Sequence, residues 1–221
     1  MSTTMRRLLA NCSGVSMTEF ALVLPILLAV GMTSVEVANY VNASMRVSQI
    51  ALSAADNAGR IRDTIDETDV DAIMIGARIA GQSIQFGAKG RVILSMVEVN
   101  GQSGGNAGQK ITWQRCFGLK NVASSYGIEG AGATNASYAA GIGPTGNKIV
   151  AAPGSGVMFV EVVYDYEPVF LVDNDLIGGL SDETLSYTAA FPVRERDDNG
   201  IKNGFGLANN EKRLCSAYTA T

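Results

Sequence analysis

The chain has 221 residues, of which 47% are hydrophobic and 17% charged, and it carries a net charge of −4 and no histidine. This composition is typical of a folded chain with a packed core and argues against an intrinsically disordered one. The acidic balance argues against nucleic-acid binding, and the lack of histidine removes the commonest general base and metal ligand.

An apolar segment follows a short basic N-terminus. Residues 20–35, FALVLPILLAVGMTSV, contain no charged residue, and residues 15–18 extend this stretch to the length of a membrane-spanning helix. Arg6 and Arg7 precede the segment, and the next basic residue is Arg46. Because the cytoplasmic flanks of membrane spans are enriched in basic residues, we expect a cytoplasmic N-terminus and an extracytoplasmic remainder.

Glu19 adjoins the apolar segment, inside the expected helix, where a charge is costly and indicates a function. A secretory signal would have a shorter apolar core followed by small residues at a cut site. A lipoprotein signal would place its cysteine after the core, whereas Cys12 precedes it. A plain transmembrane anchor accounts for the apolar residues and leaves Glu19 as a side chain that reaches to water at the membrane edge.

The N-terminal motif resembles the leader and mature start of a type IV pilin-type precursor. A basic leader, MSTTMRRLLANCSG, ends at Gly14, Glu19 is the fifth residue after it, and Phe20 supplies the aromatic residue that follows. The stretch MTEFALVLPILLAV is more closely similar to the TadE-like minor pseudopilins of tight-adherence (Tad/Flp) pilus systems. The resemblance implies that a prepilin peptidase cuts the chain between Gly14 and Val15.

This resemblance also implies a layout and a role. Residues 1–14 would be the leader peptide, residues 15–36 the transmembrane segment and residues 37–221 an extracytoplasmic α+β domain. The chain would be a minor pilin or pseudopilin of the bacterial inner membrane or the surface fibre, with other pilin subunits and the inner-membrane assembly platform as partners. Two other readings stay open. One is a single-span extracytoplasmic binding or adhesin protein that never enters a fibre, and the other is a secreted protein that loses its N-terminal segment.

The same resemblance gives Glu19 its expected role. Cleavage would create an α-amine on Val15, and the Glu19 carboxylate would pair with that amine on a neighbouring subunit. The attraction is strong in hydrocarbon because the dielectric constant is low, so pairing would favour one axial register of the subunits. Pro25 lies in the middle of the span, removes one helical hydrogen bond and predicts a kink that membrane helices tolerate.

Helical periodicity continues beyond the span and predicts one helix from about residue 15 to about residue 62. A second, short helix is predicted within residues 63–81, DTIDETDVDAIMIGARIAG, where Thr68 and Asp71 resemble a capping box. The five acids of this stretch are interpreted as carboxylates at the positive end of a helix dipole rather than as a cation site.

Four β-rich stretches predict a small antiparallel sheet. Residues 91–99 and 110–117 are expected to form a hairpin across a glycine-rich connection, and residues 157–166 and 184–193 supply two more strands. The predicted fold is α+β and pilin-like, with a long N-terminal helix, membrane-embedded in its first part, packed on this sheet.

Residues 157–166 are the clearest strand. The side that should face the long helix is apolar or aromatic and holds Met158, Val160, Val162, Tyr164 and Tyr166. Glu161 and Asp165 lie on the other side, which we expect to be a solvated outer face. Residues 118–156 are predicted to form a long surface loop, and the chain after residue 193 a polar, turn-rich tail.

The sequence contains no recognisable catalytic constellation. GIGPTGNKI lacks the ending of a phosphate loop, DNDLIGGLSDET lacks two oxygen ligands of a calcium loop, and Ser155 has no histidine to activate it. We therefore expect a structural and interaction protein rather than an enzyme, with no cofactor and no metal.

Cys116 and Cys215 are predicted to form a disulfide. Cys12 would leave with the leader, and the two remaining cysteines would lie on the extracytoplasmic side, where thiols are oxidised. The bond would pin the C-terminal tail to the strand that ends near Cys116. The alternative is two separate thiols.

Overall fold

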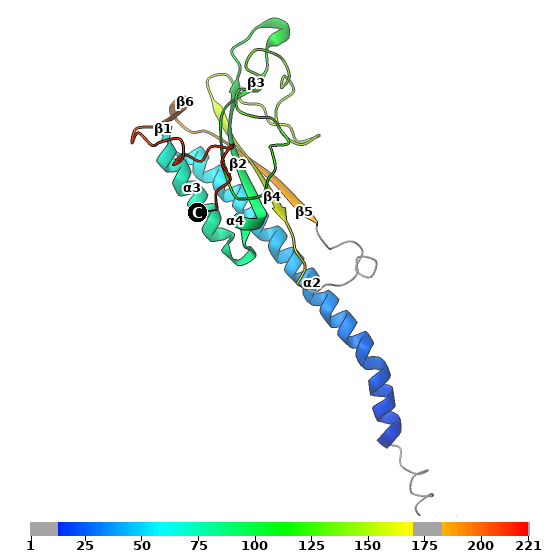
Figure 1. Ribbon diagram of the computed structural model, residues 1–221. Helices are drawn as coiled ribbons and strands as arrows, with labels where there is room; N and C mark the ends of the chain where they lie inside the picture. The colour runs from blue at the N-terminus through cyan, green and yellow to red at the C-terminus, as the bar shows by residue number, and fades with distance from the viewer. Residues whose placement is uncertain (1–12, 170–182, 221) are drawn as a thin grey trace, which may run out of the picture. The chain divides into compact units, whose positions relative to one another are not determined.

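The computed structural model describes residues 13–169 and 183–220 (Figure 1). Its elements follow in the order α2 (Ser13–Arg60), β1 (Asp63–Asp66), α3 (Glu67–Ala80), the 3-10 turn η1 (Gln82–Ile84), α4 (Phe86–Lys89), β2 (Gly90–Val99), the 3-10 turn η2 (Gly104–Asn106), β3 (Gln109–Phe117), β4 (Gly156–Asp165), β5 (Thr184–Pro192) and β6 (Arg196–Lys202). The predicted α+β fold, with a long N-terminal helix and a small antiparallel sheet, is confirmed.

The chain divides into two compact units. The N-terminal unit takes in the chain up to Val41 and the connection that begins at Glu167, and the main unit takes in the remainder. The helix α2 contributes its first part to the N-terminal unit and residues 42–60 to the main unit.

Residues 42–60 of α2 pack on the sheet of the main unit through one face. The buried residues of this face recur at helical spacing and are mostly alanine, so the helix can approach the sheet closely. They are Ala43, Val47, Ile50, Ala51, Ala54, Ala55 and Ala58. Ser44 hydrogen-bonds the hydroxyl of Tyr187 on β5. A Cβ atom at Gly59 would lie 3.2 Å from that of Phe191, which shows how near the two elements come.

The helix α3 begins at a capping box, two residues earlier than predicted. The Asp66 carboxylate accepts from the backbone N–H of Thr68, and the Asp69 carboxylate accepts from the backbone N–H of Asp66. The predicted pair of Thr68 and Asp71 is wrong, because β1 ends at Asp66 and leaves that residue in the extended conformation that an N-cap requires. The interpretation of Asp66 and Asp69 as helix-start carboxylates is confirmed.

The main sheet has the strand order β3-β2-β4-β5, and every neighbouring pair is antiparallel. Each of the four strands lies within one or two residues of its predicted position. The hairpin between β2 and β3 carries an irregularity after Met96, where the partner changes from Trp113 to Ile111. The sheet therefore follows the predicted pairing with one local shift in register.

One face of the sheet contacts the helices, as predicted. Met158, Val160, Val162 and Tyr164 of β4 are buried, and so is Tyr166 just beyond it. The Tyr164 ring stacks on Phe86 of α4, and its hydroxyl donates to the carbonyl of Ile84 at 2.9 Å. Gly81 and Gly90 leave room for this aromatic pair, because a Cβ atom at either position would lie within 2.4 Å of Phe86.

The opposite face of the sheet is covered by protein, so the predicted solvated outer face is wrong. Residues 118–155 fold back across this face and bury a second cluster of apolar side chains. The cluster contains Val97, Ile111, Ile142, Ala151, Val157 and Phe159. Glu161 is only 1% exposed, and both its carboxylate oxygens accept from the backbone N–H of Ser125, at 3.1 and 3.0 Å. Asp165 is partly exposed and pairs with Lys120 of the same long segment.

A buried asparagine holds this long segment in place. The Asn100 side-chain amide donates to the carbonyls of Asn106, Gly132 and Asn135, at 2.9, 3.0 and 3.1 Å. Its side-chain oxygen accepts from the backbone N–H groups of Gln102 and Gly108. One side chain thus supplies the hydrogen bonds that a chain without regular secondary structure needs when it is buried.

The tail after residue 193 is not only turns, because β6 pairs in parallel with β1. The sequence of β6, RDDNGIK, lacks the apolar alternation that marks a strand, so its pairing depends on non-local contacts. Nη2 of Arg196 donates to the carbonyls of Ala58 and Ile61, at 2.9 and 3.0 Å, and thereby caps the C-terminal end of α2. The Trp113 indole donates to the Asn199 carbonyl at 2.8 Å.

Glu98 ties three strands together and gives the fold an acid-sensitive contact. Its carboxylate accepts from the Thr112 hydroxyl at 2.6 Å and the Asn199 amide at 2.8 Å, and pairs with Lys110 at 3.2 Å. Burial alone would raise the pKa of Glu98, but these hydrogen bonds and the lysine hold it below its ordinary value of 4.5. The folded state therefore binds this proton more weakly than the unfolded chain.

We expect Glu98→Gln to lower the free energy of unfolding by about 1–3 kcal/mol at pH 7. The contribution of a carboxylate with a depressed pKa is present above its unfolded-state pKa and is lost as the pH falls through the folded-state value. Denaturant titrations between neutral pH and pH 3 should therefore give free energies of unfolding that converge for the wild type and Glu98→Gln at the acid end. Glu195→Gln, at an exposed carboxylate, serves as the control and should follow the wild type throughout. A constant gap between wild type and Glu98→Gln over this range would contradict the expectation.

Candidate assembly site in the N-terminal helix

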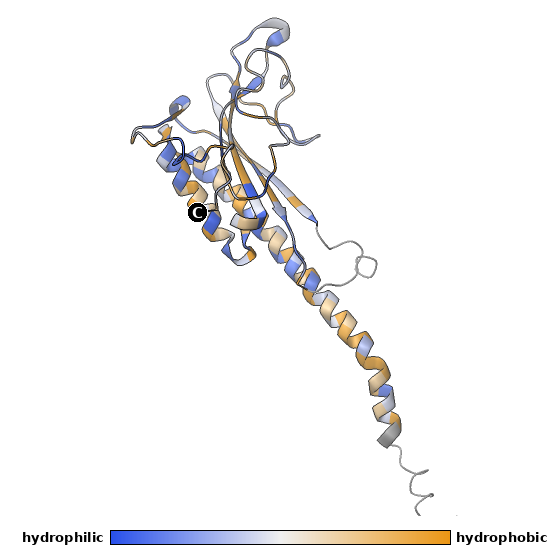
Figure 2. Ribbon diagram, in the orientation of Figure 1, coloured by the Kyte–Doolittle hydropathy of each residue, from blue (hydrophilic) through white to orange (hydrophobic). Residues whose placement is uncertain are grey.

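The first part of α2 is long and apolar enough to cross a membrane, and its most apolar stretch is almost entirely unburied by the rest of the protein. Figure 2 shows the apolar residues along this part of the helix. Leu22, Ile26, Leu27 and Val30 are all at least half exposed. A surface of this kind is compatible with hydrocarbon or other apolar helices around it.

Three hydroxyl groups in the first part of α2 are satisfied within the helix itself. The hydroxyls of Thr18 and Thr33 each donate to a backbone carbonyl in the preceding turn at 2.8 Å, and that of Ser34 does so at 2.7 Å. A hydroxyl that is bonded to its own helix costs little in hydrocarbon, so these residues are compatible with a membrane span.

Glu19 lies on α2 four residues after Val15, so the two positions share one face of the helix. Its side chain is exposed, as are those of Val15 and Phe20. Within residues 13–169 and 183–220, no hydrogen bond or ion pair to the Glu19 carboxylate is found. The carboxylate is thus available to a group outside the described chain.

Gly14 lies in the first turn of α2, which begins at Ser13. The rest of the expected leader, residues 1–12, lies outside the described residues.

The helix α2 continues through Pro25 without interruption. Proline has no N–H, so the carbonyl of Ala21, four residues earlier, loses its helical donor. The expected kink at Pro25 stays a prediction.

Glu36 is a polar anchor that the sequence analysis did not single out. It is fully buried, and its carboxylate oxygens accept from the backbone N–H of Val169 at 3.2 and 3.0 Å. Glu36 is the last residue of the expected span, and Val169 belongs to the connection that follows β4. The only signal in the sequence is an isolated acid at the end of an apolar stretch. The contact ties α2 to this connection within the N-terminal unit.

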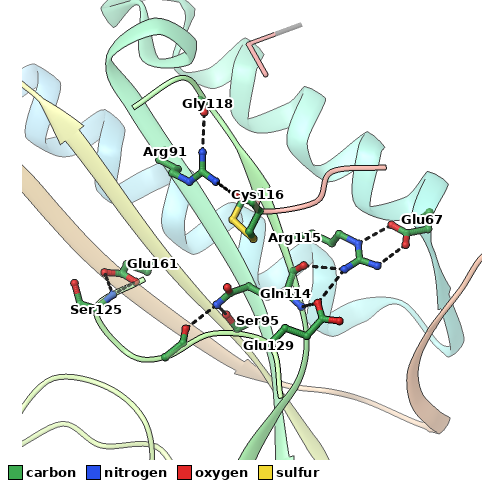
Figure 3. Close-up of a disulfide and its surroundings, with 12 residues drawn as sticks. Glu67, Arg91, Ser95, Gln114, Arg115, Cys116, Gly118, Ser125, Glu129 and Glu161 are labelled. Atoms are coloured by element: carbon green, nitrogen blue, oxygen red, sulfur yellow. Dashed lines mark hydrogen bonds and ion pairs between the residues drawn. A yellow bond between two sulfur atoms is a disulfide. The ribbon is translucent and has the colours of Figure 1, made fainter. Parts of the chain in front are cut away.

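The structure contains the predicted disulfide between Cys116 and Cys215, with their Cα atoms 4.7 Å apart (Figure 3). The tail beside it follows β3. The N–H of Cys116 donates to the Arg213 carbonyl and that of Gly118 to the Thr219 carbonyl, both at 2.7 Å. The disulfide and these bonds cover the open edge of β3, where unpaired backbone groups would otherwise invite pairing with another chain.

A buried ion pair joins α3 to β3 close to the disulfide (Figure 3). Nε of Arg115 donates to Glu67 Oε2 at 2.9 Å, and Nη2 donates to Oε1 at 2.5 Å, so the contact is bidentate. The two side chains are 7% and 3% exposed. Glu129, on the long segment, adds a second carboxylate 3.3 Å from Nη1 of Arg115. Glu67 was expected only as one of the helix-start acids, and its pairing with Arg115 was not predicted.

The described residues hold no group of three or more side chains arranged to bind a metal ion. Most of the stretch DNDLIGGLSDET, including Asp173 and Asp175, lies outside those residues.

Comparison with known proteins bears on α2 alone. The model of the TadE-like protein family matches residues 14–56, a range that lies within α2 and includes Glu19, Pro25 and Glu36. No curated protein and no solved structure matches the chain. The match agrees with the resemblance in the sequence and suggests association with a Tad pilus system. Residues 14–56 of the chain, within its N-terminal helix, are therefore similar to the TadE-like protein family.

Proposed function

We propose that this chain is a membrane-anchored minor pilin or pseudopilin that acts, without catalysis, in the assembly of a Tad-type surface pilus or a related secretion machine. The observation that carries the proposal is that three features lie on one helix. The TadE-like match, the apolar span and Glu19 all fall on the same helix, and the span is exposed along nearly its whole length.

Glu19 would act by pairing between subunits. A prepilin peptidase would cut after Gly14 and leave an α-amine on Val15, one helical turn before Glu19. The amine of one subunit and the carboxylate of the next would then form an ion pair in hydrocarbon, where an unpaired charge is costly. That cost would select the axial register in which every carboxylate has a partner. The exposed and unpaired carboxylate described above supports this role.

The remainder of the chain would serve as the extracytoplasmic part of the subunit. With the N-terminus in the cytoplasm and the span in the inner membrane, the main unit would lie outside, where its disulfide can form. Other pilin subunits and the inner-membrane assembly platform would be its partners.

We expect Glu19→Ala to insert into the membrane normally and to fail in assembly. Removing the charge eases insertion, because a charge at the centre of a span costs about 2.5–3.5 kcal/mol, and it also removes the subunit pairing. The yield of sheared fibres should fall by at least about tenfold, which corresponds to only about 1.4 kcal/mol of lost pairing energy.

Thr33→Ala, at a self-bonded hydroxyl of the same helix, is the matched control and should assemble as the wild type does. Membrane extraction with carbonate checks insertion, and electron microscopy with quantitative blotting checks the fibre. Wild-type fibre yield from Glu19→Ala would instead favour a carboxylate that only reaches to water at the membrane edge.

A further inference from the structure

A cavity of about 390 Å³ opens on the loop-covered face of the main sheet. Ile93 of β2 and the disulfide half Cys116 of β3 line it, together with residues 122–124 of the long segment and residues 214–216 of the tail. All these parts belong to the main unit. Its lining is mostly apolar, and the disulfide joins two of its walls, so the cavity is formed before any ligand arrives.

Arg91 lines this cavity, and one of its three guanidinium nitrogens has no hydrogen-bond partner. Its side chain is 1% exposed, and it donates to the Gly118 carbonyl at 3.1 Å and the Cys215 carbonyl at 2.6 Å. Tyr218 covers the guanidinium, 4.2 Å from the ring centre. Nε has no hydrogen-bond partner, and no carboxylate among residues 13–169 and 183–220 pairs with the group. A guanidinium has five N–H donors, so a buried cation here lacks both a counter-charge and some of its hydrogen bonds.

The cavity is electrically polarised. Figure 3 places Arg91 on one side of Cys116, and Gln114 with Glu129 on the other. Glu129 also lines the cavity, and its carboxylate accepts from the backbone N–H of Gln114 at 3.0 Å. A ligand with one anionic group would therefore place it at the Arg91 end and keep its other end uncharged or cationic.

We propose that this cavity binds an amphipathic monocarboxylate, with the carboxylate at Arg91 and an apolar body over the Cys116–Cys215 disulfide. A carboxylate accepts the parallel N–H donors that a guanidinium offers, and such charge-assisted bonds are strong in a buried site. The aliphatic lining from Ile93 and Ile128 suits a branched apolar body. Tyr218 is 43% exposed and is the side chain that would move aside to admit the carboxylate. A free peptide C-terminus with an apolar last residue and a small carboxylic acid both have this chemistry.

The test uses the full chain in lipid nanodiscs and ligand-observed saturation-transfer NMR. The small probes are 4-methylpentanoate and its uncharged amide, and the peptide probes are Gly-Gly-Leu with a free and with an amidated C-terminus. We expect saturable binding of the acids with a dissociation constant on the order of 1 mM, and at least about tenfold weaker binding of both amides. Tighter binding of the free peptide than of 4-methylpentanoate identifies a peptide C-terminus as the source, and equal binding identifies a small acid.

Variants that add a charge beside the cavity distinguish binding at this site from partition of the probe into the nanodisc lipid. Ile128 is 64% exposed, so Ile128→Glu and Ile128→Lys should both fold. The glutamate should weaken binding of both acids by about tenfold, because it repels the carboxylate, whereas the lysine should leave it equal or tighter. Equal signals from acid and amide, equal signals from the two Ile128 variants, or no saturation would each overturn the proposal.

Discussion

Replacing Cys116 and Cys215 together by alanine should lower the free energy of unfolding by about 4 kcal/mol. The two cysteines are 99 residues apart, so the bond removes a large loop-closure entropy from the unfolded chain. It also holds the tail in the backbone bonds that cover β3. Chemical unfolding followed by tryptophan fluorescence reports on this region, because the single tryptophan, Trp113, lies on β3.

Cys12→Ala is the matched control for the disulfide variant. Cys12 belongs to the expected leader, so its loss should leave the unfolding midpoint unchanged. Reduction of the wild-type protein should reproduce the effect of the double variant. An unchanged midpoint in both the double variant and the reduced protein would show that the tail is held without the bond.

Glu67→Gln should lower the free energy of unfolding by about 3–5 kcal/mol. The substitution leaves the Arg115 guanidinium buried and replaces the Glu67 carboxylate by a neutral amide, which has one acceptor oxygen and cannot balance the charge. The double variant Glu67→Leu with Arg115→Met removes both charges and should recover most of the loss, because a buried pair is about as stable as an apolar pair of similar size. Denaturant unfolding measured for the single and double variants gives the comparison.

Glu129→Gln is the control for the buried pair. The Glu129 side chain is 55% exposed, so its ion pair with Arg115 should contribute within about 1 kcal/mol. An equal loss of stability from Glu129→Gln and Glu67→Gln would contradict the distinction between an exposed and a buried carboxylate.

Local pattern was enough to predict the framework of the fold. The α2 helix follows from a continuous apolar and helical sequence, and β4 follows from strict alternation, so both were predicted with small errors at their ends. The order of the hairpin strands follows from their glycine-rich connection. The pairing of Cys116 and Cys215 could be predicted because the expected topology placed both thiols in an oxidising compartment.

The contacts that local sequence pattern could not predict are polar and join residues that are far apart along the chain. Glu161 alternates as an outward residue should, yet residues 118–155 cover it, and nothing local to β4 indicates that a segment low in charge will fold back. Arg196 caps α2 from a distance of more than 130 residues along the chain. The bond between Glu36 and Val169 likewise joins the end of the span to a connection 133 residues later.

The candidate functional residues likewise fall into those that a sequence motif identifies and those that only the folded chain brings together. Gly14, Glu19 and Phe20 could be selected from the sequence because a motif places them. All three lie in the first part of α2, where Glu19 and Phe20 are exposed. Glu36 and the Arg91 cavity belong to no motif, and they depend on segments that meet only in the folded chain.

The most direct test of a pilin-type subunit is the N-terminus of the protein isolated from membranes, determined by mass spectrometry. We expect a chain that begins at Val15. We also expect that Gly14→Ala leaves the chain uncut in the membrane, whereas Ser13→Ala is cut normally. A mature chain that begins at Met1, or beyond residue 36, or a Gly14→Ala chain trimmed at the same bond, would contradict a pilin-type subunit.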